Sequence, residues 1–151
     1  MTDKYEIQNY VGDLFEFENF EICEIIYAYN LPSWPKFSKR LKLETLNRVF
    51  TDKLRCLSHF GCTQTDINSL SELLINKCLL SCDVASYAQK IPLIGRMITV
   101  GKFPVVMKAM KAATVEYVYC RSNRGTAEEA LYVAKHTYWR SIIEFLDTWV
   151  F

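Results

Sequence analysis

IPLIGRMITVGKFPVVMKAM, residues 91–110, is an almost wholly apolar run that carries a Gly95-Arg96 pair near its start. A helix that is apolar on every side is stable only where other helices surround it. Burying an arginine is costly unless its charge has a partner or a use. The run therefore predicts a helical bundle around a central hydrophobic helix, with one positive charge beside an apolar groove. Such an arrangement is typical of a peptide-binding module rather than an enzyme.

Helical periodicity extends on both sides of this run, and no segment shows the period-2 alternation of a strand. We expect an all-α fold of six to eight helices. The expected helices cover residues 3–30, 41–60, about 66–80, 84–90, 92–120 and 126 to the end of the sequence.

Local signals set several of the expected helix boundaries. Gly61 is a C-terminal stop, and Thr65 or Asp66 can cap the helix that follows it. Asp83 can begin a further short helix, and Pro104 should kink or split the central one. Residues 126–129, TAEE, form a capping box that begins the last helix.

The overall composition indicates one domain spanning residues 1–151. Eighteen basic and 17 acidic side chains give a net charge of +1, so no general attraction to nucleic acid or anionic lipid is expected. The N-terminal residues lack the apolar core of a secretory signal, and no apolar segment is long enough for a membrane span. We therefore expect a cytoplasmic protein whose six cysteines are reduced thiols.

Candidate catalytic chemistry is sparse. The sequence has two histidines and no nucleophile elbow, zinc-protease motif or phosphate-binding glycine loop, so we expect no enzyme, no cofactor and no metal. A cysteine-dependent enzyme using Cys56 or Cys62 with His59 stays open as an alternative. Basic and aromatic residues interleave over residues 34–48, but a solvated helix start explains them better than a nucleic-acid site.

The Gly95-Arg96 pair at the opening of the most apolar helix resembles the Bcl-2 family of apoptosis regulators. In that family an Asn-Trp-Gly-Arg motif opens the central helix, and Leu93-Ile94 stand here in place of Asn-Trp. The last helix resembles the family's sixth, with Trp149 where its second homology motif has a tryptophan. Residues 50–58 resemble a BH3 pattern, with His59 in place of the usual aspartate. The degenerate motifs are most similar to those of virus-encoded members.

The resemblance implies an inhibitor of apoptosis that sequesters BH3 helices of pro-apoptotic proteins of the Bim, Bak or Bax type in a hydrophobic groove. Arg96 would pair with the aspartate of the ligand, and Gly95 would allow its backbone to approach closely. The implied apolar lining is Phe50, Leu54, Leu57, Leu73, Leu74, Val100 and Phe103. The protein would act in the host cytoplasm or peripherally at mitochondria through its partner.

Several alternatives stay open at this point. Arg96 can pair internally with Glu72 or Asp83, and the apolar set can be ordinary core. Some viral relatives keep the Bcl-2 fold, lack the groove and bind signalling adaptors of innate immunity instead. A homodimer is also open, through exposed aromatic residues such as Trp34, Trp149 and Phe151.

Overall fold

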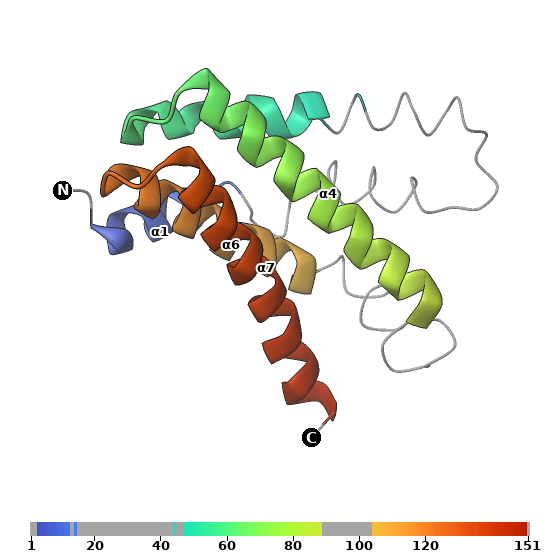
Figure 1. Ribbon diagram of the computed structural model, residues 1–151. Helices are drawn as coiled ribbons and strands as arrows, with labels where there is room; N and C mark the ends of the chain where they lie inside the picture. Colours follow the sequence, from blue (N-terminus) through green and yellow to red (C-terminus); the bar gives the residue numbers. More distant parts are fainter. Residues whose placement is uncertain (1–2, 13, 15–43, 45–46, 89–103, 151) are drawn as a thin grey trace.

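The computed structural model describes residues 3–12, 14, 44, 47–88 and 104–150, and within these it contains helices and turns but no strand. The elements are α1 (Lys4–Gly12), η2 (Arg55–Phe60), α4 (Gln64–Ala88), α6 (Pro104–Ser122) and α7 (Ala127–Val150) (Figure 1). Residues 47–54 are also helical and lead directly into η2. The all-α prediction is confirmed for this part of the chain.

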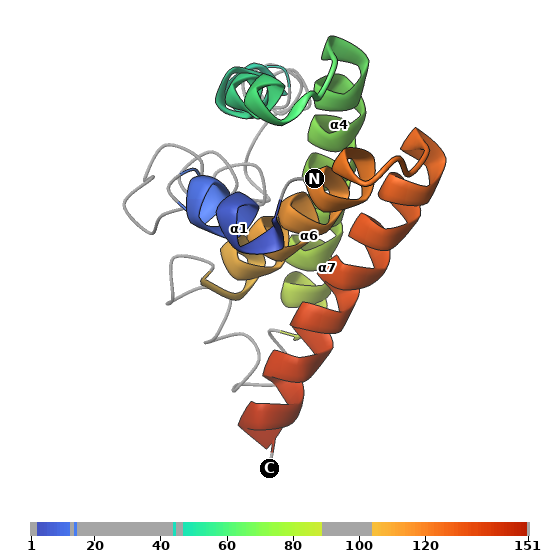
Figure 2. The same ribbon diagram turned by 90° about the vertical axis from the view of Figure 1, so that its left-hand side faces the viewer.

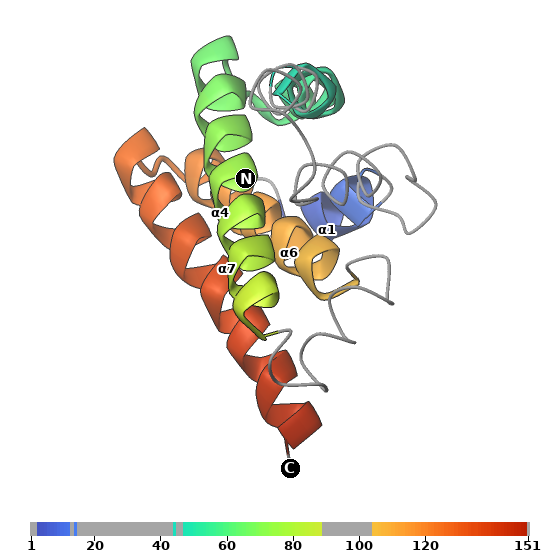
Figure 3. The same cartoon turned by 90° about the vertical axis from the view of Figure 1, so that its right-hand side faces the viewer.

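Helix α6 is the central element of the described bundle. It packs against α1, η2, α4 and α7, and the contact with α7 is the most extensive. Figures 2 and 3 show α6 between α1 on one side and α7 on the other, with α4 running across them. The small residues Ala109 and Ala113 of α6 have no exposed surface.

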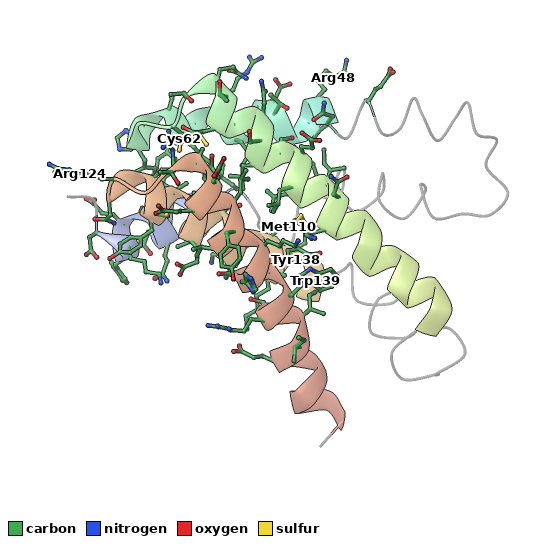
Figure 4. All side chains as sticks on the ribbon, in the orientation of Figure 1. Arg48, Cys62, Met110, Arg124, Tyr138 and Trp139 are labelled. Atoms are coloured by element: carbon green, nitrogen blue, oxygen red, sulfur yellow. The ribbon has the colours of Figure 1, made fainter. Side chains whose placement is uncertain are left out.

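The core follows the helical spacing of the apolar residues. Helix α1 contributes Ile7 and Val11, one turn apart, and α7 contributes Ala130, Ala134 and Tyr138 at successive turns. Tyr138 packs edge-to-face on Trp139 with ring centroids 5.5 Å apart, and Tyr138 belongs to the same buried cluster as Met110 of α6 (both labelled in Figure 4). The resulting core joins all the described elements.

Three helix boundaries are set by local hydrogen bonds, and two of them match the predictions. Gly61 ends η2 in the left-handed conformation, with φ of 86°, and the Thr126 hydroxyl accepts the Glu129 N–H at 3.1 Å. Helix α4 begins earlier than predicted because Thr63 is its cap. The Thr63 Oγ1 accepts the Asp66 N–H at 3.2 Å, and the Asp66 carboxylate accepts the Thr63 N–H at 2.9 Å.

The predicted break between residues 80 and 84 is wrong, because α4 is one continuous helix from Gln64 to Ala88. No glycine or proline interrupts residues 80–84, and an aspartate inside a helix costs only a fraction of a kilocalorie per mole in helix propensity. Helix α6 begins at Pro104, the position expected to split the central helix. A proline lacks a backbone N–H, and in the first turn of a helix this costs little because that N–H would have no partner within the helix. The Gly95-Arg96 pair and most of the predicted helix over residues 3–30 lie outside the described residues.

Gly125 lies in the turn between α6 and α7, where a side chain would clash. Its N–H donates to the Cys120 carbonyl at 2.8 Å, and an added Cβ would lie 2.7 Å from that oxygen and collide with the Cys120 sulfur. We expect Gly125→Ala to lower the free energy of unfolding by about 1–3 kcal/mol in urea titrations. Gly12→Ala is the control, because its Cβ would meet only the flexible end of Lys111, at 3.4 Å. Equal stability of the two variants would contradict this prediction.

Candidate functional site

The structure places four of the predicted groove residues in the core. Phe50, Leu54, Leu57 and Leu74 have no exposed surface, and Leu73 is partly buried and packs against them and their neighbours. They come from residues 47–54, η2 and α4, which lie side by side (Figure 1). Their burial matches the alternative of ordinary core. Gly95, Arg96, Val100 and Phe103 lie outside the described residues, so a ligand-binding role for the set stays a prediction.

The BH3-like segment packs its apolar face into its own fold. Leu54 and Leu57 point into the core, whereas Arg55 lies on the surface, 3.5 Å from Asp52. His59 is also exposed, and its ring stacks on Tyr10 of α1 with centroids 5.3 Å apart. In this structure the segment is therefore a structural element that is not presented to a partner.

A cleft of about 450 Å³ opens between the helical segment that contains residues 44 and 47–54 and α4. Among the described residues, two carboxylates and three carboxamides line the cleft, and Ile75 supplies an apolar wall. These described lining residues are Glu44, Asn47, Asn68, Glu72, Ile75 and Asn76. Asn47 lies one turn before Phe50, and Ile75 follows Leu74, so the cleft borders the predicted groove residues. It is large enough for a side chain or a small ligand.

A buried carboxylate that the sequence offered only as a possible helix cap joins α4 to α6. Asp66 is 3% exposed, and it accepts hydrogen bonds from Tyr117 Oη at 2.7 Å and from Arg121 Nε at 3.0 Å. Arg121 also donates to the Gly125 carbonyl at 3.1 Å, which ties the cluster to the turn before α7. The Thr-x-x-Asp spacing at residues 63–66 is the sequence signal that could have identified the cap, but nothing in it indicates Tyr117 or Arg121.

The electrostatics of Asp66 follow from these partners. Burial by itself raises the pKa of the carboxyl, but hydrogen bonds from Tyr117, Thr63 and Arg121 favour the charged form more strongly and hold the pKa below its usual value. Burial and the hydrogen bond to Asp66 raise the pKa of Tyr117. The cluster is thus a charged carboxylate satisfied by neutral and cationic donors at neutral pH.

The candidate cysteine chemistry lacks a reactive thiol in this structure. Burial, reinforced by the charge of Asp66, raises the pKa of Cys62 to about 11, and Figure 4 shows it where α4 begins. Burial also raises the pKa of Cys56, whose thiol donates to the Lys53 carbonyl at 3.0 Å. A protonated thiol is a weak nucleophile. These environments therefore do not favour the cysteine-enzyme alternative.

Within the described ranges, no group of three or more His, Cys, Asp or Glu side chains is placed to hold a metal ion. None of the helices that the structure describes is both long and apolar enough to cross a bilayer.

No protein-family model, no curated protein and no solved structure matches this chain.

Proposed function

We propose that this protein is a Bcl-2-like inhibitor of apoptosis that sequesters the BH3 helix of a pro-apoptotic partner between residues 47–60 and α4. The observation that supports the proposal best is the open cleft between these two elements, next to the predicted groove residues. The enclosure of α6 by α1, η2, α4 and α7 agrees with the central helix that the sequence resemblance implies. A helix in such a groove would bury its apolar residues and pair its aspartate with Arg96.

Binding of this kind includes a conformational step. Phe50, Leu54, Leu57 and Leu74 are fully covered, so a ligand reaches them only after residues 47–60 move away from α4. The ligand would bind the open form, and the observed affinity falls by the fraction of molecules that are open. Leu73 is partly exposed and would be the first of the set to meet the ligand.

The proposal assigns the charge pair to Arg96. We expect Arg96→Ala to weaken binding of a Bim-type BH3 peptide at least about tenfold in calorimetry, since breaking a partly desolvated ion pair costs about 2–5 kcal/mol. Arg140→Ala, an exposed position on α7, is the matched control and should bind as the unchanged protein does. Equal affinity of the Arg96 variant and the unchanged protein would contradict the assigned groove.

A second candidate function is the binding of innate-immune signalling adaptors without BH3 recognition. The complete burial of Phe50, Leu54, Leu57 and Leu74 favours it, because a groove that never opens offers a BH3 helix no apolar contact. A protein that binds none of a panel of BH3 peptides, but captures such an adaptor directly, would support this function over the first.

The location of the protein in the cell would follow from its partner. A BH3 partner would place the protein in the host cytoplasm or peripherally at mitochondria. The side chains expected to form a homodimer interface, Trp34, Trp149 and Phe151, lie outside those that the structure describes, so dimerisation stays a prediction.

A further inference from the structure

We infer that residues 47–60 open and close as one unit about Gly61, and that Tyr10 of α1 is the latch that holds them closed. The inference rests on the proposed function only for what this latch does to ligand binding. The opening is a property of the free protein, so it can be measured without a ligand.

Tyr10 contacts both ends of η2, although it belongs to another helix. Its ring stacks on the ring of His59 with centroids 5.3 Å apart, and it packs edge-to-face on Phe60 at 5.1 Å. At the other end of η2, its hydroxyl donates a long hydrogen bond of 3.4 Å to the Cys56 carbonyl. The rings of His59 and Phe60 lie 5.0 Å apart, so the three rings form one cluster. Aromatic pairs of this geometry stabilise a contact beyond the area that they bury.

The aromatic cluster lies at the surface, outside the core that closure buries. Tyr10 is 38% exposed and His59 is exposed as well, whereas Leu54 and Leu57 have no exposed surface. Burial of such apolar side chains drives closure. Removing the Tyr10 ring leaves no cavity in that core, so it changes how often residues 47–60 open without changing what they cover.

The contacts at the other side of residues 47–60 permit an opening. The Ser71 hydroxyl of α4 donates to the Asn47 side-chain oxygen at 3.3 Å, and the Thr51 and Ser71 hydroxyls are 3.4 Å apart. Both distances are long for a hydroxyl donor. Gly61 has a φ of 86°, in a region that glycine enters freely, so the chain can turn there at little cost. Thr63 already belongs to the cap of α4, which places the turning point between η2 and α4.

Amide hydrogen exchange of the full chain measures this opening. The amides of residues 50–58 should exchange at least about tenfold faster than those of Ala134 and Tyr138, which are buried in α7, because local opening leaves the rest of the bundle folded. Tyr10→Ala should speed exchange of residues 50–58 at least about fivefold. Tyr5→Ala is the matched control on the same helix, since its ring is 66% exposed, and should leave exchange unchanged.

A second variant separates local opening from a loss of overall stability. Gly125→Ala strains the turn between α6 and α7, which local opening leaves in place. It should therefore speed exchange in α7 and leave residues 50–58 unchanged. Equal exchange rates in the two regions, with an equal response to Gly125→Ala, would show that the bundle opens only as a whole and would overturn the inference. An effect of Tyr10→Ala on residues 50–58 no larger than that of Tyr5→Ala would overturn it as well.

Titration with a Bim-type BH3 peptide links the latch to the proposed function. Because the ligand would bind the open form, Tyr10→Ala should raise the affinity by the same factor by which it speeds exchange of residues 50–58. Faster exchange in Tyr10→Ala, without binding of any BH3 peptide, would overturn only the proposed function. BH3 binding, with exchange and affinity that Tyr10→Ala leaves unchanged, would overturn only the latch.

Discussion

Asp66→Ala is expected to lower the free energy of unfolding by about 3 kcal/mol or more in urea titrations. The change removes a carboxylate that is 3% exposed and leaves the buried hydroxyl of Tyr117 without its acceptor at 2.7 Å. It also removes the partner of the Arg121 guanidinium, whose side chain is 31% exposed, and the carboxylate that accepts the Thr63 N–H at the start of α4. Several donors therefore lose one shared acceptor at once.

Tyr117→Phe provides the graded control for this prediction. It deletes one hydrogen bond and keeps the Asp66–Arg121 pair, so we expect a loss of about 1 kcal/mol. A loss for Asp66→Ala no larger than that for Tyr117→Phe would contradict the role of Asp66 as the shared acceptor.

Acid titration gives an independent readout of the same cluster. The pKa of Asp66 is lower in the fold than in a free side chain, so its contribution to stability is present above the ordinary pKa. That contribution is lost as the pH falls through the lowered value. The unchanged protein should therefore lose stability over this acidic range more steeply than Asp66→Ala does, and parallel curves would count against the cluster.

Leu54→Ala is expected to cost about 2–5 kcal/mol of unfolding free energy, as large-to-small changes in a packed core do. Leu54 has no exposed surface and belongs to the cluster formed with α1, α4, α6 and α7. Thermal and urea unfolding measure the effect. The side chain supports the fold in the closed state, whatever it contacts when a ligand is bound.

Tyr132→Ala is the control, because Tyr132 is 65% exposed on α7 and should change stability by less than about 0.5 kcal/mol. If Leu54→Ala changed the unfolding free energy as little as Tyr132→Ala does, Leu54 would lie in an already open groove. The closed arrangement of residues 47–60 on α4 would then be wrong.

The sequence predicted those features of the fold that local chemistry determines. Gly61 and Thr126 mark helix boundaries because a left-handed glycine and a hydroxyl cap act within a few residues. The continuity of α4 could not be read in the same way. Considered alone, Asp83 is a suitable first residue for a helix. Only the structure shows that the preceding helix continues through it to Ala88.

The candidate site was less predictable because its properties arise from tertiary packing. Helical spacing correctly selected Leu54 and Leu74 as apolar positions, but periodicity does not say whether a ligand or another helix covers them. In the Asp66 cluster, Tyr117 and Arg121 follow Asp66 by 51 and 55 positions in the sequence, and no local pattern links them to it. The cleft likewise depends on how residues 44 and 47–54 lie against α4.

The most direct test of the central claim is a titration of the full chain with a Bim-type BH3 peptide, followed by backbone amide chemical shifts. The account predicts saturable shifts along residues 47–60 and along α4 around Leu73, with the outer face of α7 at Tyr132 and Ile143 unchanged. A peptide in which the BH3 aspartate is replaced by alanine should bind at least about tenfold more weakly. An absence of shifts, or shifts confined to α7, would contradict the proposal that this protein holds a BH3 helix between residues 47–60 and α4.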